Sequence, residues 1–320
     1  MNSNSPLEHF VTLFDSNFLP MGLALHHSLL SHGQPFHLWI ICMDELVEEQ
    51  LARIALPHVT LLSLKSVETP KLLAVKPDRS RGEYCWTITP FTFQAVFEQD
   101  DGVKRVTYLD SDLFFFDGPH ILFSELEAAK KDVLITEHAY APEYAYYLNL
   151  SGRFCVQFVT FGRTAAAAKV MRWWQERCLE WCFERHEEGK FGDQKYLDAW
   201  PELFTDEVHV LRQTEKTLAP WNVKYFEKLH ERLDPVFYHF QGFRIIGPNE
   251  VRLYGGYEIE NKGLKLYEVY LAALRQSLCK MQEFDIPMPF MPEEMGLKER
   301  LMKMILRDPH FVKIHKRANM

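Results

Sequence analysis

Two aspartates separated by one serine, Asp110-Ser111-Asp112, are the residues whose types and spacing best suit chemistry. They follow an apolar run that predicts a strand over 106–109, so they would lie at its carboxyl end, where open α/β sheets bind ligands. In extended backbone, positions i and i+2 face the same side, which would aim both carboxylates at one point. Two such oxygen ligands suit Mg²⁺ or Mn²⁺ holding a diphosphate, whereas a structural turn is the alternative interpretation.

Alternating strands and helices are predicted to position this acidic pair. Helical periodicity and apolar runs indicate βαβ units, and hence an α/β fold with a Rossmann-like, mostly parallel sheet flanked by helices. We expect one catalytic domain over 1–290 and a helical C-terminal tail over 291–320. The predicted strands cover 10–14, 36–42, 58–63, 133–136 and 158–161. The predicted helices cover 21–32, 45–56, 87–98, 164–188 and 264–281.

The tail differs from the rest of the chain in charge. The 320-residue chain has a formal net charge of −8, to which 296–320 contribute +5 and the remainder −13. An acidic body argues against a nucleic-acid-binding protein. Within the tail, 297–307 predicts a basic amphipathic helix, which would either lie on anionic lipid as a peripheral membrane contact or pack as a solvated helix on the body.

The sequence carries no recognisable signal for secretion or membrane insertion. Its start lacks a charged region followed by an apolar stretch, and no run approaches the roughly 18 apolar residues of a membrane span. We therefore expect a cytoplasmic protein. The lipid-bound alternative for the tail would place it at the inner face of the membrane.

Three further motifs occur in an order that resembles one enzyme family. They are Thr12-Leu-Phe-Asp-Ser-Asn-Phe18, Phe191-Gly-Asp-Gln-Lys-Tyr196 and His239-Phe-Gln-Gly242. From about residue 9 to residue 260, the chain resembles nucleotide-sugar transferases of the glycosyltransferase A fold, closest in pattern to family 8, which includes glycogenin and bacterial lipopolysaccharide galactosyltransferases. The resemblance implies metal-dependent transfer of a hexose from a nucleotide-diphosphate sugar, a UDP-sugar, to a carbohydrate, glycolipid or other acceptor, with retention of configuration.

The same resemblance assigns a metal site. It implies that Asp110, Asp112 and His239 bind Mn²⁺ or Mg²⁺, with Ser111 beside the bound nucleotide sugar. A neutral imidazole is a suitable ligand for Mn²⁺ and would come from a distant part of the chain. Taken alone, His239 would instead be a hydrogen-bonded core histidine.

The nucleotide would be held by residues from both ends of the chain. In the family, the loop after the first strand grips the nucleoside, which implies roles for Phe14, Asp15 and Phe18. Phe18 would stack on uracil, although ordinary core packing is the alternative. Near the other end, Gly242 and Arg244 would adjoin the diphosphate, and Arg244 offers forked positive charge. The family has a lysine after the glycine of this motif, and Arg244 is displaced by one position from the place where that lysine would align.

The donor sugar would lie beside Asp193 and Gln194. The resemblance implies that Asp193 binds sugar hydroxyls and that Gln194 lies near the anomeric carbon, so both are candidate catalytic residues. Asp193 could also cap a helix, which is compatible with this role. Upstream, Cys155 and Gln157 replace an asparagine and a glycine of the family, and these replacements leave the donor sugar open.

Two other functions are alternatives to this interpretation. A sugar nucleotidyltransferase shares a related layout but usually carries a glycine-rich loop with Lys or Arg after its first strand, which 14–18 does not have. The other rival is a catalytically degenerate glycosyltransferase-like protein that binds a nucleotide or a partner. The segment 137–151, which carries four tyrosines, would either line an acceptor cleft or belong to a lid or core edge.

Overall fold

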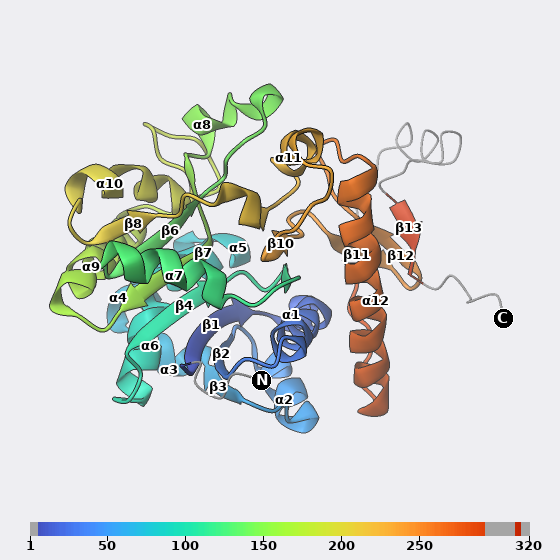
Figure 1. Ribbon diagram of the computed structural model, residues 1–320. Coiled ribbons are helices and arrows are strands. Elements are labelled where there is room, and N and C mark those ends of the chain that lie inside the picture. Colours follow the sequence, from blue (N-terminus) through green and yellow to red (C-terminus); the bar gives the residue numbers. More distant parts are fainter. Residues whose placement is uncertain (1–5, 292–310, 315–320) are drawn as a thin grey trace.

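The computed structural model describes residues 6–291 and 311–314 (Figure 1). Within these residues the largest sheet has seven strands in the order β3-β2-β1-β4-β7-β6-β8. Strand pairs β3-β2, β2-β1, β1-β4 and β6-β8 are parallel, whereas β7 runs antiparallel to both β4 and β6. The prediction of a mostly parallel sheet is therefore confirmed. The strands are β1 (Glu8–Phe14), β2 (Phe36–Cys42), β3 (Val59–Ser63), β4 (Arg105–Leu109), β6 (Val133–Glu137), β7 (Phe154–Gly162) and β8 (Val208–Val210).

Helices cover both faces of this sheet. Phe10 of β1 belongs to a core shared with α1 and α7, whereas its neighbour Val11 belongs to a second core shared with α6 and α9. Both faces are buried because successive strand residues point to opposite sides. The longer helices are α1 (Leu19–Ser31), α2 (Glu45–Ile54), α5 (Arg81–Ile88), α6 (Thr92–Gln99), α7 (His120–Ala129), α9 (Ala165–Glu180) and α12 (Asn261–Glu283). The shorter ones are α3 (Leu64–Val67), α4 (Pro70–Val75), α8 (Tyr147–Leu150), α10 (Trp200–Leu203) and α11 (Val223–Leu229).

Two of the predicted helices differ from the observed ones. The helix predicted over 87–98 is divided by a 3₁₀ turn at Thr89–Phe91, because Pro90 has no N–H to donate to a helical hydrogen bond. The helix predicted over 164–188 ends at Glu180, and Trp181 already has extended backbone. Beyond it the chain turns through Glu188 and Gly189, which both have positive φ.

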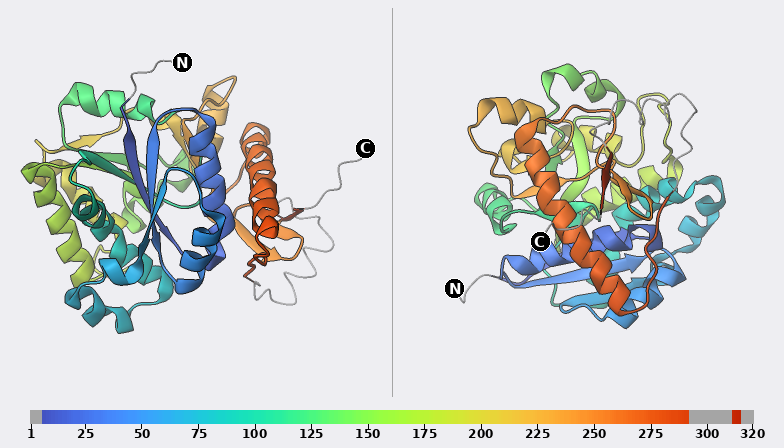
Figure 2. Two further views of the ribbon diagram at one scale, coloured as in Figure 1. Left: turned by 90° about the horizontal axis from the view of Figure 1, so that it is seen from below. Right: turned by 90° about the vertical axis from the view of Figure 1, so that its right-hand side faces the viewer.

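Two small sheets accompany the large one in the described part of the chain. Strand β10 (Phe237–His239) lies between β5 (Leu113–Phe115) and β9 (Thr217–Leu218), and β12 (Glu250–Arg252) lies between β11 (Arg244–Gly247) and β13 (Phe311–Lys313). Figure 2 shows the long helix α12 lying across the α1 side of the molecule. The amphipathic helix predicted over 297–307, and with it the membrane contact, lies outside the described residues.

The described helices do not include a membrane span. In 6–291 and 311–314, no helix combines the length and the apolar character needed to cross a bilayer.

Candidate active site

A tight turn between β4 and β5 carries the two aspartates. The Leu113 N–H donates to the Asp110 carbonyl (3.1 Å), and the Asp110 N–H donates to the Gln157 carbonyl of β7 (3.1 Å). The backbone at Ser111 and Asp112 is therefore a turn and not the extended chain that the sequence suggested. The carboxylates still converge, because the turn folds Asp112 back toward the carboxyl end of β4.

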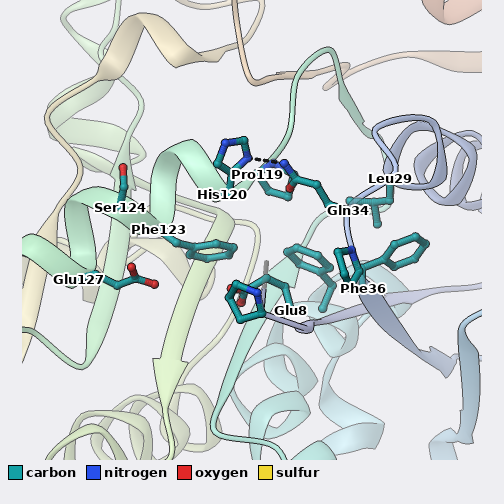
Figure 3. Close-up of a pocket in the computed structure, with 12 residues that line it drawn as sticks. Glu8, Leu29, Gln34, Phe36, Pro119, His120, Phe123, Ser124 and Glu127 are labelled. Atoms are coloured by element: carbon teal, nitrogen blue, oxygen red, sulfur yellow. Dashed lines mark hydrogen bonds between the residues drawn. The ribbon is translucent and has the colours of Figure 1, made fainter. Parts of the chain in front are cut away.

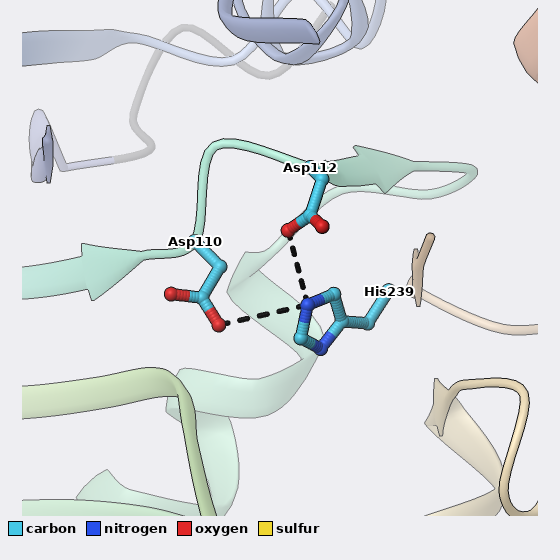
Figure 4. Close-up of side chains that lie close together, drawn as sticks. All are labelled: Asp110, Asp112 and His239. Carbon is cyan, nitrogen blue, oxygen red and sulfur yellow. Dashed lines mark ion pairs between the residues drawn. The ribbon is translucent and has the colours of Figure 1, made fainter. Parts of the chain in front are cut away.

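The third side chain, His239, comes from β10 and is placed by strand pairing. In the antiparallel β5-β10 pair His239 lies opposite Leu113, and the Phe240 N–H donates to the Asp112 carbonyl (2.9 Å). His239 Nε2 lies 3.0 Å from Asp112 Oδ1 and 3.6 Å from Asp110 Oδ2 (Figure 4). Residues about 127 positions apart in sequence are thus brought to one point. We call Asp110, Asp112 and His239 the metal triad.

Two neighbours hold the metal triad in this orientation. Gln157 Oε1 lies 2.8 Å from His239 Nδ1, and an amide oxygen can only accept, so Nδ1 carries a proton and Nε2 faces the carboxylates. The Tyr108 hydroxyl donates to Asp110 Oδ1 (3.0 Å). Such outer partners fix the tautomer and the ring orientation of a ligand histidine.

The electrostatics of the metal triad favour a bound cation. Burial raises the pKa of Asp110 to about 6, against the opposing pull of His239. Burial would also raise the pKa of Asp112, but His239 and Arg244 outweigh it and lower that pKa. For His239, burial alone lowers the pKa, yet Asp112 and Asp110 raise it well above its ordinary value. The imidazolium therefore supplies the positive charge that a metal ion would otherwise bring to this acidic pair.

The donor set and spacing fit a hard divalent ion. The three ligand atoms all lie within 4.8 Å of one another. Neighbouring ligands on an octahedral ion with bonds of about 2.1 Å are about 3 Å apart, close to the separations around His239 Nε2. Two carboxylates and one imidazole suit Mn²⁺ or Mg²⁺ better than a thiolate-preferring metal. The Asp110 side chain is 29% exposed, so the site opens to solvent.

Two of the residues expected to bind the nucleotide lie together beside the metal triad. The Arg244 guanidinium lies 5.2 Å from the centre of the Phe18 ring and contributes to the lowered pKa of Asp112. The Phe18 ring is partly buried against the core, so core packing accounts for part of its surface. Asp15 accepts from the Asn17 N–H (2.8 Å) and pairs with Arg81 Nε (2.8 Å).

The predicted sugar residues are placed by the segment after α9. Asp193 is buried, and within the described chain its Oδ2 has no hydrogen-bond partner. Burial, with a smaller contribution from the Asp110 charge, raises the pKa of Asp193 well above its ordinary value. Gln194 Nε2 donates to the Ser151 carbonyl (2.8 Å), which ties the residue to the tyrosine-rich segment.

Three other residues were expected to bind the nucleotide sugar, and the structure shows their packing or backbone conformation. They are Phe14, Ser111 and Gly242. The Phe14 ring is buried under α1, where a Cβ at Gly22 would come within 2.4 Å of it. Ser111 is buried inside the aspartate turn. Gly242 has φ +81°, a left-handed conformation that favours glycine, and its carbonyl accepts from Arg252 Nε (3.3 Å).

Sequence reasoning missed three partners at the site. Tyr108 precedes Asp110 by two residues on one strand face, so strand periodicity could have identified it. Gln157 was noted only as a replacement of a glycine, and its bond to His239 depends on the packing of β7 against β10. Arg81 contacts Asp15 from α5, and no local pattern indicates that contact.

A cavity of about 480 Å³ lies elsewhere (Figure 3). It is lined by Glu8 and Phe36, at the amino ends of β1 and β2, and by Gln34 and His120, which hydrogen-bond to each other. Because β1 and β4 are parallel, this cavity lies at the opposite edge of the sheet from Asp110. It is separate from the candidate active site.

Two Bacillus subtilis proteins match the chain along most of its length. YfnD, described as uncharacterized, is 31% identical over 320 residues, covering 96% of this chain and 98% of YfnD. YfnF, also described as uncharacterized, is 31% identical over 291 residues, covering 86% of this chain and 94% of YfnF. No protein-family model matches the chain.

Solved structures of glycosyltransferases share the fold. The galactosyltransferase LgtC, in complex with donor and acceptor sugar analogs, matches with a TM-score of 0.52 at 11% identity over 84% of this chain and 95% of LgtC. The bifunctional WbbM matches with a TM-score of 0.51 at 15% identity over 90% of this chain but 53% of WbbM, so the chain spans about half of that protein. The prediction of a glycosyltransferase A fold is confirmed.

Proposed function

The chain belongs to the family of the Bacillus subtilis proteins YfnD and YfnF, and we propose that it is a metal-dependent glycosyltransferase of the family 8 type. It would transfer a hexose from a UDP-sugar to an acceptor, with retention. One observation carries the proposal. The metal triad converges at the carboxyl end of β4, where a sheet of this fold binds ligands.

A divalent ion held by Asp110, Asp112 and His239 would neutralise charge on the diphosphate and stabilise the departing UDP. Arg244 adds a second positive charge, close enough to Asp112 to lower its pKa, and would bind the diphosphate beside the ion. Positive groups fixed before the reaction stabilise developing negative charge without reorganisation. The Phe18 ring beside Arg244 offers a face for the base of the nucleotide.

Asp193 would bind the donor sugar. Its Oδ2 lies buried without a partner in the described chain, and burial together with the Asp110 charge raises its pKa well above the ordinary value. A buried carboxyl group without a partner is costly, and sugar hydroxyls would satisfy it. Gln194 follows directly, and its side chain is held by the hydrogen bond to the Ser151 carbonyl.

The test is hydrolysis of UDP-hexoses with Mn²⁺, comparing wild type with Asp112→Asn. We expect the variant to lose activity by a factor on the order of 10²–10³, because one ligand charge disappears. Asp101→Asn is the control, since that side chain is 99% exposed and lies in an ion pair with Arg163. Nucleotide binding that is independent of Mn²⁺ and unchanged in Asp112→Asn would instead favour the degenerate, non-catalytic alternative.

A further inference from the structure

A continuous series of aromatic rings leads away from the metal triad. The Trp221 ring lies 5.4 Å from the His239 ring, edge to face, and 6.2 Å from the Tyr257 ring. Tyr257 lies 6.1 Å from Tyr147, and Tyr147 lies 4.3 Å from Tyr146. A second branch joins Trp221 to Tyr147 through Tyr140. We call Tyr140, Tyr146, Tyr147 and Tyr257 the tyrosine surface.

Trp221 forms a rigid floor for the tyrosine surface. Its indole N–H donates to the His138 carbonyl (2.8 Å), and its own carbonyl accepts from the Ala141 N–H (2.9 Å). The Asn222 side chain donates to the same His138 carbonyl (3.0 Å). These bonds connect His138 and Ala141, at the start of the tyrosine-rich segment, to the turn after β9. Strand β9 in turn pairs with β10, which carries His239.

Exposure increases with distance from the metal triad. Trp221 is buried, Tyr140, Tyr147 and Tyr257 are half-buried, and Tyr146 is 55% exposed. Tyr146 does not belong to the hydrophobic core clusters of the described residues. A row of rings that begins at a candidate reaction centre and ends in solvent has the form of a binding surface rather than a core edge.

We propose that the tyrosine surface binds a neutral saccharide and thereby positions the acceptor for the proposed transfer. The C–H groups on the face of a pyranose ring pack against aromatic faces, while its hydroxyls reach the polar tips of tyrosines. Burial raises the pKa of the Tyr140 and Tyr257 hydroxyls, so both remain protonated and able to donate. The role as acceptor site rests on the proposed function, but saccharide binding as such does not.

The charges around the tyrosine surface favour a neutral ligand. Lys224 lies among three glutamates, 3.7 Å from Glu143, 4.0 Å from Glu260, and in an ion pair with Glu258. The Glu258 N–H also donates to the Tyr144 hydroxyl (2.8 Å), so this acidic group adjoins the rings. An excess of carboxylates beside the rings disfavours an anionic acceptor or an anionic lipid surface.

Saturation-transfer NMR on the metal-free and donor-free protein tests the proposal with lactose, maltose and cellobiose as probes. We expect ring protons of at least one disaccharide to receive saturation. Tyr147→Ala should weaken this binding about 3- to 10-fold, and Tyr147→Phe should retain most of it, because the stacking face remains. Tyr225→Ala is the matched control, since Tyr225 is an exposed tyrosine whose ring contacts Phe226 on α11.

Three outcomes would overturn the proposal. The first is the absence of saturation transfer from the wild-type protein to all three disaccharides. The second is an equal loss in Tyr225→Ala. The third is binding to neutral phosphatidylcholine vesicles, through Tyr146 and the exposed Leu148, in place of sugar. UDP-hexose hydrolysis without saccharide contact would leave the proposed function standing and remove only this inference. Saccharide contact without hydrolysis would leave saccharide binding standing and would remove the proposed function together with the acceptor role.

Discussion

The metal triad and the tyrosine surface meet at Trp221, yet their side chains are held in different ways. His239 is 6% exposed and has Gln157 on one ring nitrogen and Asp112 on the other. Tyr146, at the far end, is 55% exposed and lies against another tyrosine ring. The first region is fixed in position before any ligand arrives, as chemistry requires. The second offers contact area, which suits recognition of a ligand that varies in size.

The largest expected effect concerns the residue shared by both regions. Trp221→Ala removes a buried indole and leaves the Ala219–Asn222 turn without its packing, so we expect a loss of about 3–5 kcal/mol in the free energy of unfolding. Urea denaturation followed by circular dichroism measures it. Trp221→Phe keeps most of the ring volume and should cost clearly less. If Trp221→Ala changed stability by less than about 1 kcal/mol, Trp221 would not be the rigid floor described above.

The next-largest effect concerns Gln157, which supports the metal triad but is not itself a metal ligand. Gln157→Leu removes the acceptor of the His239 N–H while keeping a similar volume, so Mn²⁺ affinity should fall about 10- to 100-fold. Isothermal titration calorimetry measures the change. Gln175→Leu is the matched control, because Gln175 is also buried but bonds to Pro90 and Gln94. Equal affinities in Gln157→Leu and wild type would show that the histidine needs no such support.

Gln157 also shows where sequence-based prediction of this site ends. Asp110 and Asp112 could be placed because an apolar strand directly precedes them, which is a local pattern. The role of Gln157 depends on β7 packing beside β10, strands about 80 residues apart, and no periodicity reports that contact. The conformation of the acidic pair was likewise missed, since an i, i+2 argument assumes extended backbone where the chain makes a turn.

The fold, like the site, could be predicted where the signal is local and could not where it depends on contacts between distant residues. Strand β2 over Phe36–Cys42 was predicted to its ends because an apolar run buried on both faces has sharp borders. The predicted start of α2 at Glu45 is also correct, because Asp44 caps the helix and accepts from the Val47 N–H (2.7 Å). In contrast, α9 ends at Glu180, and the carbonyl of the extended Trp181 accepts from the Tyr196 hydroxyl (2.8 Å), a contact between distant residues that helical periodicity does not encode.

The metal triad should depend on pH in a way that the tyrosine surface does not. Mn²⁺ requires Asp110 as a carboxylate and His239 with a free Nε2, and the pKa of Asp110 is raised to about 6. Protons on His239, whose pKa is raised well above its ordinary value, and on Asp110 therefore compete with the metal, and this competition grows as the pH falls toward 6 and below. We expect Mn²⁺ affinity to drop about tenfold per pH unit for each proton displaced. Titration calorimetry in buffers of different ionisation enthalpy counts those protons. Equal Mn²⁺ affinity well above and well below pH 6 would contradict this protonation scheme.

The smallest expected effect lies at the outer end of the tyrosine surface. Because Tyr146 is 55% exposed, Tyr146→Ala should change the free energy of unfolding by less than about 0.5 kcal/mol. The same substitution should weaken disaccharide binding, because it removes a stacking face. Chemical denaturation and saturation-transfer NMR on one sample measure both quantities. A stability loss near that of Trp221→Ala, with unchanged saccharide contact, would make Tyr146 part of the core edge, and the distinction between the two regions would then fail.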